Sequence, residues 1–391
     1  MQMFVFAIAA TVIWGGAHYY VGQRLIVGSG LERPFSYWAW GVVALHASLS
    51  PIAFTSRRLL PDDTWLFNAL QWLTYVGMGF FVLLFLALLS KDLVFWVAKL
   101  FGWFDPANPF PDDPDRRTLL TSGLNLGIFA ASGVATGVGY VNATKRPTVD
   151  EVDILVDGLH PDLEGLRIVQ ISDMHIGPTL KRPFVEMVVD VVNQLDADVI
   201  AVTGDLVDGL PGDLRDELAP MSQMKSRHGA FYVTGNHELY WNAHGWQDEA
   251  PRLGMKTLAN SHAVVRVGRA RLLMGGVNDL HTGRFFPEEA SDPHAAMNGA
   301  PQHDFSVLLA HQPKSCYEAA PAGWRLQLSG HTHGGQFFPW NFFVGLAHPF
   351  TAGLDKWEDM WVYVNRGTGY WGPPLRLGIP SEVTALTLRR A

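Results

Sequence analysis

The sequence of 391 residues is long enough for two or three domains. Its net charge of -8, with no long basic run, argues against a nucleic-acid-binding surface. The single cysteine, Cys316, excludes an internal disulfide framework and a metal site built from thiolates alone. A mean hydropathy of +0.09 with 17% charged residues is high for a soluble protein, and the apolar excess lies before about Lys145.

The N-terminal third is predicted to be a membrane region. A bilayer crossing needs about 20 mostly apolar residues, and four stretches approach or exceed that length: Met3 to Val27, Tyr37 to Phe54, Trp65 to Ser90 and Leu119 to Val141. The first stretch has no basic n-region and is longer than the apolar core of a signal peptide, so we do not expect it to be a leader. Residues 1–145 are therefore predicted to be a bundle of four transmembrane helices.

The lysine and arginine pattern predicts the orientation of this region. Four spans would place both termini on one side, with Arg57, Arg58, Lys145 and Arg146 close to the membrane there. The opposite side carries a larger set, namely Arg24, Arg33, Lys91, Lys99, Arg116 and Arg117. The positive-inside rule then predicts a multi-pass protein of the cell membrane whose C-terminal domain is extracytoplasmic.

Beyond Val141 the pattern changes to alternating strands and helices. The β-branched runs Arg167 to Ile171 and Val199 to Val202 are typical of strands, and apolar residues at helical spacing lie between them, from Phe184 to Leu195. This order predicts an α/β sheet in residues 146–391. Asn142 to Asp150 is predicted to be a short polar linker. Further strands are expected at Phe231 to Val233, Val307 to Leu309, Leu326 to Leu328 and Val383 to Leu388.

Five short motifs, each directly after an apolar run, carry the chemistry. The carboxyl ends of strands are where an α/β sheet presents its active site, and the glycines at 204, 235 and 330 are expected to let the backbone turn sharply there. The motifs are Ser172-Asp173-Met174-His175, Gly204-Asp205-Leu206-Val207-Asp208, Gly235-Asn236-His237-Glu238, Ala310-His311-Gln312 and Gly330-His331-Thr332-His333.

Imidazole and carboxylate ligands together suit manganese, zinc or iron. Two such divalent metal ions, about 3.5–4 Å apart, activate water and hold the negative charge that builds up when a phosphate ester is hydrolysed. A lone Asp-X-His triplet is usually part of a solvated loop, Gly-Asn-His-Glu is more specific, and Gly-His-Thr-His-Gly-Gly is more specific still. A purely structural explanation is weak for all five motifs in order. The sequence therefore predicts a two-metal phosphoesterase that acts by attack of a metal-bridging hydroxide.

From about Ile154 to the C-terminus the chain resembles the calcineurin-like metallophosphoesterases. Within that superfamily it is most similar to the bacterial membrane-associated branch that includes UDP-2,3-diacylglucosamine pyrophosphatase-like proteins. The supporting stretches, beside the motifs, are residues 166–173, 308–313, 366–369 and 373–376. The resemblance implies an αββα sandwich with a dinuclear metal site at the sheet edge.

The resemblance also implies the roles of the motif residues. Asp173, His175, Asp205 and His333 would bind one metal ion. Asp205 would bridge to a second ion, completed by Asn236, His311 and His331. His237 would contact the substrate phosphate and protonate the leaving oxygen.

Four other residues have two interpretations each. Asp208 is expected to orient a ligand or to hold a turn, and Glu238 to be structural or to support a ligand. Arg366 and Arg376 are candidates for binding a second phosphate or headgroup, with surface ion pairs as the alternative.

An aromatic run, Phe337 to Phe343, follows the last metal motif. It is expected either to wedge into the bilayer beside a lipid-linked substrate or to fold onto the core. The function predicted overall is a membrane-anchored phosphodiesterase or pyrophosphatase acting on a lipid- or envelope-linked phosphate. The alternative is a membrane sensor or transporter bundle with a regulatory phosphoesterase domain.

Overall fold

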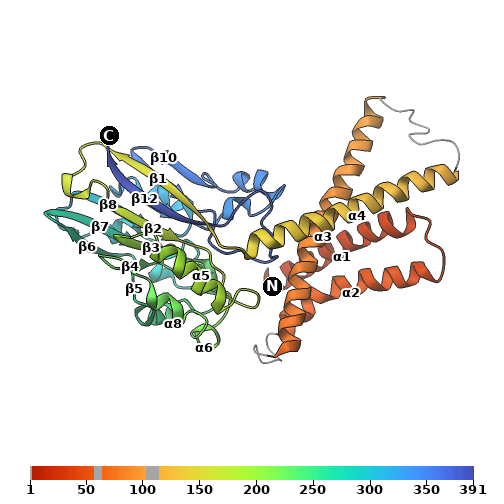
Figure 1. Ribbon diagram of the computed structural model, residues 1–391, viewed down its shortest axis with the longest axis horizontal. Helices are drawn as coiled ribbons and strands as arrows, with labels where there is room; N and C mark the ends of the chain where they lie inside the picture. Colours follow the sequence, from red (N-terminus) through yellow and green to blue (C-terminus); the bar gives the residue numbers. More distant parts are fainter. Residues whose placement is uncertain (1, 57–63, 103–113) are drawn as a thin grey trace. The chain divides into compact units, whose positions relative to one another are not determined.

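The computed structural model describes residues 2–56, 64–102 and 114–391, and the chain divides into two compact units (Figure 1). The first unit comprises residues 1–140 and is helical. The second comprises residues 141–391 and contains every described strand.

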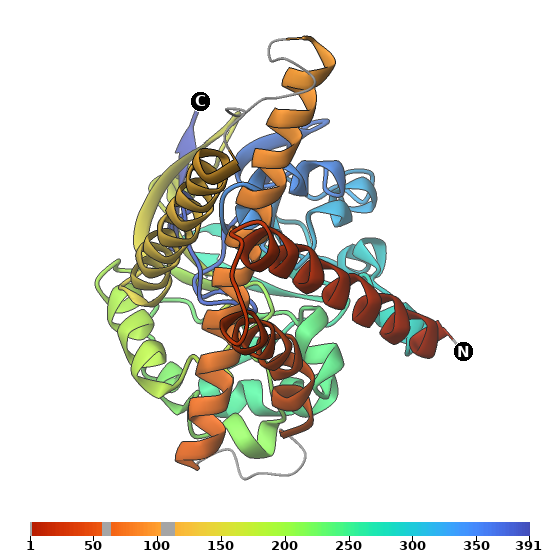
Figure 2. The same cartoon turned by 90° about the vertical axis from the view of Figure 1, so that its right-hand side faces the viewer.

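Four helices occur in the described residues of the first unit. These are α1 (Gln2–Gly22), continued by a π-helical turn (Gln23–Val27), α2 (Phe35–Ser56), α3 (Trp65–Leu100) and α4 (Pro114–Thr144), whose last residues belong to the second unit. The core of this unit is built on Val21 of α1 and on Phe81, Leu84 and Leu88 of α3. Helix α3, with 36 residues, is roughly 54 Å long at 1.5 Å per residue and can be followed along its length in Figure 2.

Two of these helices, not four, are long and apolar enough to cross a membrane among the described residues. They are Trp65–Leu100 and the Leu119–Thr144 part of α4. The prediction of four spans is therefore wrong in number, although a helix covers each predicted stretch. In α2 the apolar residues are interrupted by polar and small ones, among them Gly41, His46, Ser48, Ser50 and Pro51.

Two mixed six-stranded sheets form the second unit. The first has the order β1-β12-β2-β3-β4-β5 and the second has the order β10-β11-β9-β8-β7-β6. Strands β2 to β5 are parallel, as are β7, β8, β9 and β11. The bounds are β1 Thr148–Val156, β2 Arg167–Ile171, β3 Val199–Val202, β4 Ala230–Tyr232, β5 Met255–Thr257, β6 Ser261–Val267, β7 Ala270–Gly276, β8 Phe305–Leu309, β9 Leu326–Ser329, β10 Gly353–Trp357, β11 Met360–Val364 and β12 Glu382–Arg390.

Apolar side chains of both sheets form the core between them, where Ile168 and Val199 of the first sheet share a cluster with Leu272 and Val307 of the second. The outer faces are covered by helices. Helix α5 (Arg182–Asn193) packs Val185, Val188 and Val192 against the first sheet, and α10 (Cys316–Ala319) belongs to the cluster on the second. The other short helices are α6 (Pro211–Leu214), α7 (Asn236–Tyr240), α8 (Ala243–Glu249) and α9 (Pro293–Met297). This arrangement confirms the predicted α/β sandwich.

The predicted linker between the two regions is wrong. Residues 142–144 form the end of α4, and Thr148 to Asp150 form the start of β1, so only residues 145–147 lie between the two elements. Polar residues such as Thr148 and Asp150 suggested a linker, but they lie on β1, an edge strand, where side chains are largely exposed.

Candidate metal centre

The five motifs meet where the carboxyl ends of strands from the two sheets come together. Asp173, Asp205 and Asn236 follow β2, β3 and β4 of the first sheet, and His311 and His331 follow β8 and β9 of the second. A side-chain hydrogen bond joins the sheets beneath them, because Gln170 Nε2 donates to the backbone oxygen of Ser329 at 2.9 Å. Parallel neighbouring strands thus place residues far apart in the chain at one edge.

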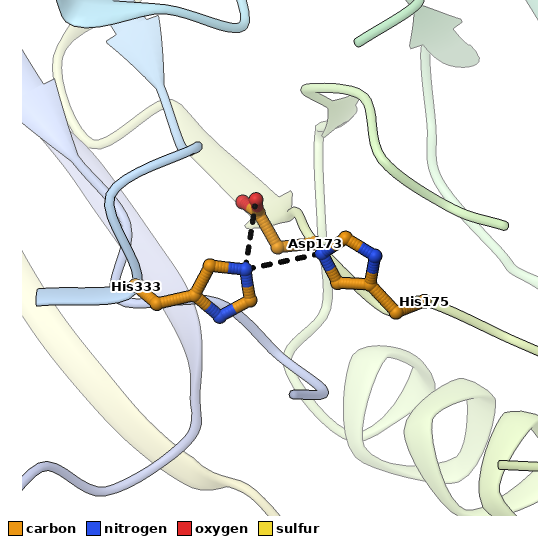
Figure 3. A group of neighbouring side chains, drawn as sticks. All are labelled: Asp173, His175 and His333. Atoms are coloured by element: carbon orange, nitrogen blue, oxygen red, sulfur yellow. Dashed lines mark hydrogen bonds and ion pairs between the residues drawn. The ribbon is translucent and has the colours of Figure 1, made fainter. Parts of the chain in front are cut away.

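Asp173, His175 and His333 form the first group of metal-binding side chains, and all three are buried (Figure 3). His333 Nε2 lies 3.3 Å from Asp173 Oδ1 and 3.1 Å from His175 Nε2. The backbone N–H of His331 donates to the Asp173 carboxylate at 3.0 Å. Three potential ligand atoms therefore converge on one small volume.

Asp205, His311 and His331 form the second group. His311 Nδ1 lies 2.8 Å from the backbone oxygen of Thr203, which leaves Nε2 to face the group, 3.1 Å from Asp205 Oδ2 and 3.2 Å from His331 Nδ1. The same Asp205 Oδ2 lies 3.9 Å from His175 Nε2 of the first group. One carboxylate oxygen thus lies within 4 Å of a histidine from each of the two groups.

Comparison with known proteins matches the calcineurin-like phosphoesterase model to residues 166–335. A transmembrane protein with metallophosphoesterase domain from Bos taurus is 33% identical over 91% of this chain and 82% of its own length. An uncharacterized metallophosphoesterase of Campylobacter jejuni is 30% identical over 100% of this chain and 99% of its own. The chain belongs to the calcineurin-like phosphoesterase family.

A transmembrane protein with metallophosphoesterase domain from Danio rerio is 40% identical, over 65% of this chain and 60% of its own length. The chain therefore spans less than two thirds of that relative. The family consists of metal-dependent phosphoric ester hydrolases, and the two groups of histidine and aspartate residues are consistent with its binuclear metal site.

Asn236 and His237 are placed against Asp205 by the backbone. The N–H of His237 donates to Asp205 Oδ1 at 2.8 Å. The side-chain oxygen of Asn236 is buried and meets no hydrogen-bond donor in the part of the chain that the structure describes. A buried carbonyl oxygen without a donor is a suitable metal ligand, since it would otherwise carry an uncompensated desolvation cost.

Asp208 contacts two histidines of this phosphoesterase site. His237 Nδ1 hydrogen-bonds to Asp208 Oδ1, and His175 Nδ1 lies 3.4 Å from Asp208 Oδ2. The carboxylate thus holds His237 with its Nε2 turned away from the bond. Of the two interpretations given for Asp208, orientation of site residues is the one that the geometry favours.

The charges of the site suit a cation. Burial alone would raise the pKa values of Asp173 and Asp205, but the neighbouring His333 and His311 outweigh it and hold both pKa values below the usual range. Burial lowers the pKa of His331 to about 3 and that of His333 to about 4, so these rings are neutral at pH 7. Around the carboxylates, His331 and His333 are therefore neutral imidazoles, which is the protonation state that metal binding needs. His311 differs, because against the effect of burial the neighbouring Asp205 carboxylate raises its pKa, so binding of a cation there would have to displace a proton from the ring.

His237 differs from these histidines in its electrostatic surroundings. Burial opposes its charged form, but the charge of Asp205 and the hydrogen bond to Asp208 prevail and raise the pKa of His237 to about 9.

The backbone of the site is left-handed at residues other than glycine. Such a conformation costs about 1–3 kcal/mol per residue and persists only where the surroundings impose it. The φ angles of these residues lie between 50° and 72°, and the residues are Asp173, His175, Asp205, His331 and His333. All five were predicted as metal ligands, but their strain was not visible in the sequence.

Two of the three motif glycines, Gly235 and Gly330, serve a purpose different from the one predicted. Only Gly204 has a positive φ, of 87°. A Cβ on Gly235 would lie 2.1 Å from Asp205 Oδ1, and a Cβ on Gly330 would lie 2.0 Å from Ser172 Oγ. These two positions are glycine because other side chains approach the backbone closely, not because the chain turns sharply.

The side chain of Glu238 hydrogen-bonds to the backbone of two motifs. Its buried carboxylate accepts the N–H groups of Gly235 at 2.7 Å, Asp205 at 2.9 Å and Leu206 at 2.6 Å. It therefore fastens the turn after β4 to the turn after β3, which sets the distance between Asn236 and Asp205. The structural role expected of Glu238 is the one that the geometry favours.

The two arginines considered for substrate binding make ion pairs or hydrogen bonds with other residues of the protein. Arg366 pairs with Glu382 and Asp150. Arg376 is only 1% exposed and donates to the backbone oxygens of residues 366, 367 and 369 and of His333. Arg376 therefore holds the loop that packs behind His333, a role neither sequence interpretation foresaw. The run Pro373-Pro374-Leu375 just before it was the available signal, since it brings the chain back as a rigid segment.

Proposed function

We propose that this protein is a membrane-anchored, divalent-metal-dependent phosphoesterase. Its reaction is the hydrolysis of a phosphodiester or pyrophosphate bond in a lipid- or envelope-linked substrate. The observation that supports this most strongly is the position of Asp205 Oδ2, within 4 Å of a histidine from each of the two ligand groups. A carboxylate between the two ligand groups lies where a shared ligand of two adjacent cations would be placed.

The residues fit two ions of manganese, zinc or iron. Asp173, His175, Asp205 and His333 would hold one, and Asp205, Asn236, His311 and His331 the other. Only oxygen and imidazole nitrogen donors are offered, which excludes a site for soft, thiolate-seeking ions. When bound, the two ions supply an activated water and neutralise the charge that builds up on the phosphate oxygens.

The protein's own part in the reaction is to position groups and to move a proton. His237 would contact the phosphate and pass its Nε2 proton to the leaving oxygen, while Asp208 keeps the ring oriented through Nδ1. Glu238 would maintain the spacing between Asp205 and Asn236, and Arg376 would hold the backbone of His333 in place.

The membrane part of the proposal is supported by the apolar helices and by the relatives. Helix α3 and most of α4 are long and apolar enough to span a bilayer, and two relatives are named transmembrane proteins with a metallophosphoesterase domain. We propose residues 1–145 as the membrane region and residues 146–391 as the enzyme domain. The extracytoplasmic orientation remains a prediction, and Arg57 and Arg58, on which it depends, lie outside the described residues.

Similarity to the UDP-2,3-diacylglucosamine pyrophosphatase-like branch remains part of the proposal and would make the substrate a nucleotide-diphospho-lipid. One observation, a polar network in the helical unit, supports the alternative function. That alternative is a sensor or transporter bundle with a regulatory phosphoesterase domain. Asp92 of α3 pairs with Arg24 at 2.7 Å, and Lys91 donates to Asn125 of α4 at 2.9 Å. Charged groups among apolar helices often mark a functional pathway.

The decisive experiment is the assay of the purified full chain with manganese or zinc. Chromogenic phosphodiesters and monoesters would be tested first, and nucleotide-diphospho-lipids next. Asp205→Ala and Asn236→Ala should abolish turnover while resistance to proteolysis is retained. Lys91→Met with Asp92→Asn should leave hydrolysis unchanged. Near-normal activity of either site variant would contradict the metal centre, and loss of activity in the network variant would support the alternative.

A further inference from the structure

A loop without formal charge follows the last metal motif. From Gly334 to Leu354 the sequence contains no lysine, arginine, aspartate or glutamate. Residues 337–350 of this segment, here called the aromatic loop, contain two successive 3-10 turns, Trp340–Phe342 and Val344–Leu346. Five of its large apolar side chains are exposed, with exposed fractions of 54% for Phe338, 56% for Trp340, 68% for Phe342, 50% for Phe343 and 86% for Leu346. Phe350, at the end of the loop, packs against the apolar cluster on the second sheet.

The base of the aromatic loop is fastened to the metal centre. Thr332, which lies between His331 and His333, donates its hydroxyl to the backbone oxygen of Thr351 at 2.6 Å and so closes the loop. At the far end, the ring of His348 lies 5.1 Å from the ring of His331. The apolar tip is therefore held at a set distance from the ligands.

Trp371 extends this apolar surface to the proposed catalytic histidine. Its side chain is 56% exposed, and its ring lies 5.9 Å from that of His237. The backbone of Trp371 is joined to the loop by Gln336, which donates to its oxygen at 2.9 Å and accepts from its N–H at 2.8 Å. An exposed aromatic surface thus reaches from the loop to the edge of the site.

The lipid bilayer is the partner that this surface fits. Residues 145–147 are all that separate α4 from β1, and three residues extend at most about 10–11 Å. Because α4 contains a candidate span, the domain that carries the loop is tied to the membrane. Tryptophan and other aromatic side chains favour the headgroup level of a bilayer, and the loop carries no formal charge that would have to be desolvated there.

We propose that the aromatic loop and Trp371 insert into the bilayer surface and hold the metal centre at the headgroup level. The substrate class is then a phosphoester whose apolar chain stays in the membrane while its phosphate reaches His237. The statement about the substrate rests on the proposed function, whereas the insertion of the loop does not.

Insertion is tested in the full chain, reconstituted in vesicles of phosphatidylcholine and phosphatidylglycerol. Trp340→Cys is labelled with an environment-sensitive fluorophore. The native Cys316 is buried and should not react. Arg269→Cys is the control, because the Arg269 side chain is 91% exposed in the turn between β6 and β7. Lipids carrying spin labels on their acyl chains should quench the label at position 340 strongly and the label at position 269 hardly at all.

Equal and weak quenching at both positions would overturn the inference. A label at position 340 that is shielded from aqueous iodide without being quenched by the lipids would mean that protein covers the loop, and the inference would fail. If insertion is observed but the wild-type chain hydrolyses no phosphoester, the proposed function fails and the insertion stands.

A second measurement connects insertion to the substrate. Trp340→Ser combined with Phe342→Ser should lower hydrolysis of a lipid-linked diphosphate about tenfold or more, because two apolar side chains no longer hold the site at the membrane. Hydrolysis of a soluble chromogenic ester should change less than about twofold, within the usual effect of surface substitutions. Tyr317→Ser, at an exposed aromatic residue of α10, is the matched control. An equal loss on both substrates would contradict the role in substrate access.

Discussion

Replacing Asp208 by alanine is expected to slow hydrolysis of esters with poor leaving groups by about 10- to 150-fold. The magnitude follows from a single contact, the hydrogen bond between Asp208 Oδ1 and His237 Nδ1. Hydrogen bonds to charged groups contribute about 1.5–3 kcal/mol, and 1.36 kcal/mol corresponds to a factor of ten. The two side chains are only 19% and 13% exposed, so water can replace the lost contact only in part.

The assay compares two phosphodiesters, one with an alkyl and one with a nitrophenyl leaving group. A nitrophenolate departs without a proton, so Asp208→Ala should slow its release much less than that of the alkoxide. Asp208→Asn keeps an oxygen that can accept from His237 and should recover part of the rate. Asp213→Asn, an exposed residue of α6, is the matched control.

Two outcomes would refute this reasoning. If Asp208→Ala stays within about twofold of the wild type on the alkyl ester, the contact does not position the acid. If the double variant Asp208→Ala with His237→Ala is much slower than His237→Ala alone, Asp208 acts through another group, such as His175 at 3.4 Å. The metal content of the purified Asp208→Asn variant shows whether a ligand has been lost.

Three further predictions concern other parts of the site. Glu238→Gln should lower the free energy of unfolding by about 1–3 kcal/mol, since one of three buried N–H donors would face the new amide group, and pulse proteolysis of the full chain measures this loss. An unchanged stability would mean that these bonds contribute little. Gly235→Ala should reduce activity and metal content together, because its Cβ would lie 2.1 Å from Asp205 Oδ1; Gly212→Ala, where a Cβ meets nothing within 4 Å, is its control. Burial raises the pKa of the Cys316 thiol to about 12, so a thiol reagent should label it only after unfolding, and prompt labelling of the native chain at pH 8 would contradict this.

The sequence by itself determined the elements that carry the motifs. Strands β2 and β3 begin and end at the predicted residues, and the others predicted agree to within a few residues. These strands lie inside the sheets, where both faces are buried, so their sequences are continuous apolar runs that can be recognised locally. The strands that were not predicted are β1, β5, β6, β7, β10 and β11. Four of them are edge strands, and β1 and β10 carry charged residues such as Asp153 and Lys356 on exposed faces. Strands β7 and β11 lie inside the second sheet and were missed although they are largely buried.

The chemistry of the site was visible in the sequence as residue types, and its arrangement was not. Only the tertiary structure brings Asp205 of one sheet to His311 of the other and shows that the same oxygen faces His175. It also explains Gly235 and Gly330 by close contacts with residues distant in the chain, and it buries Arg376. Residue types and strand-forming patterns are local properties, whereas shared ligands, close approaches and burial are decided by which strand ends meet.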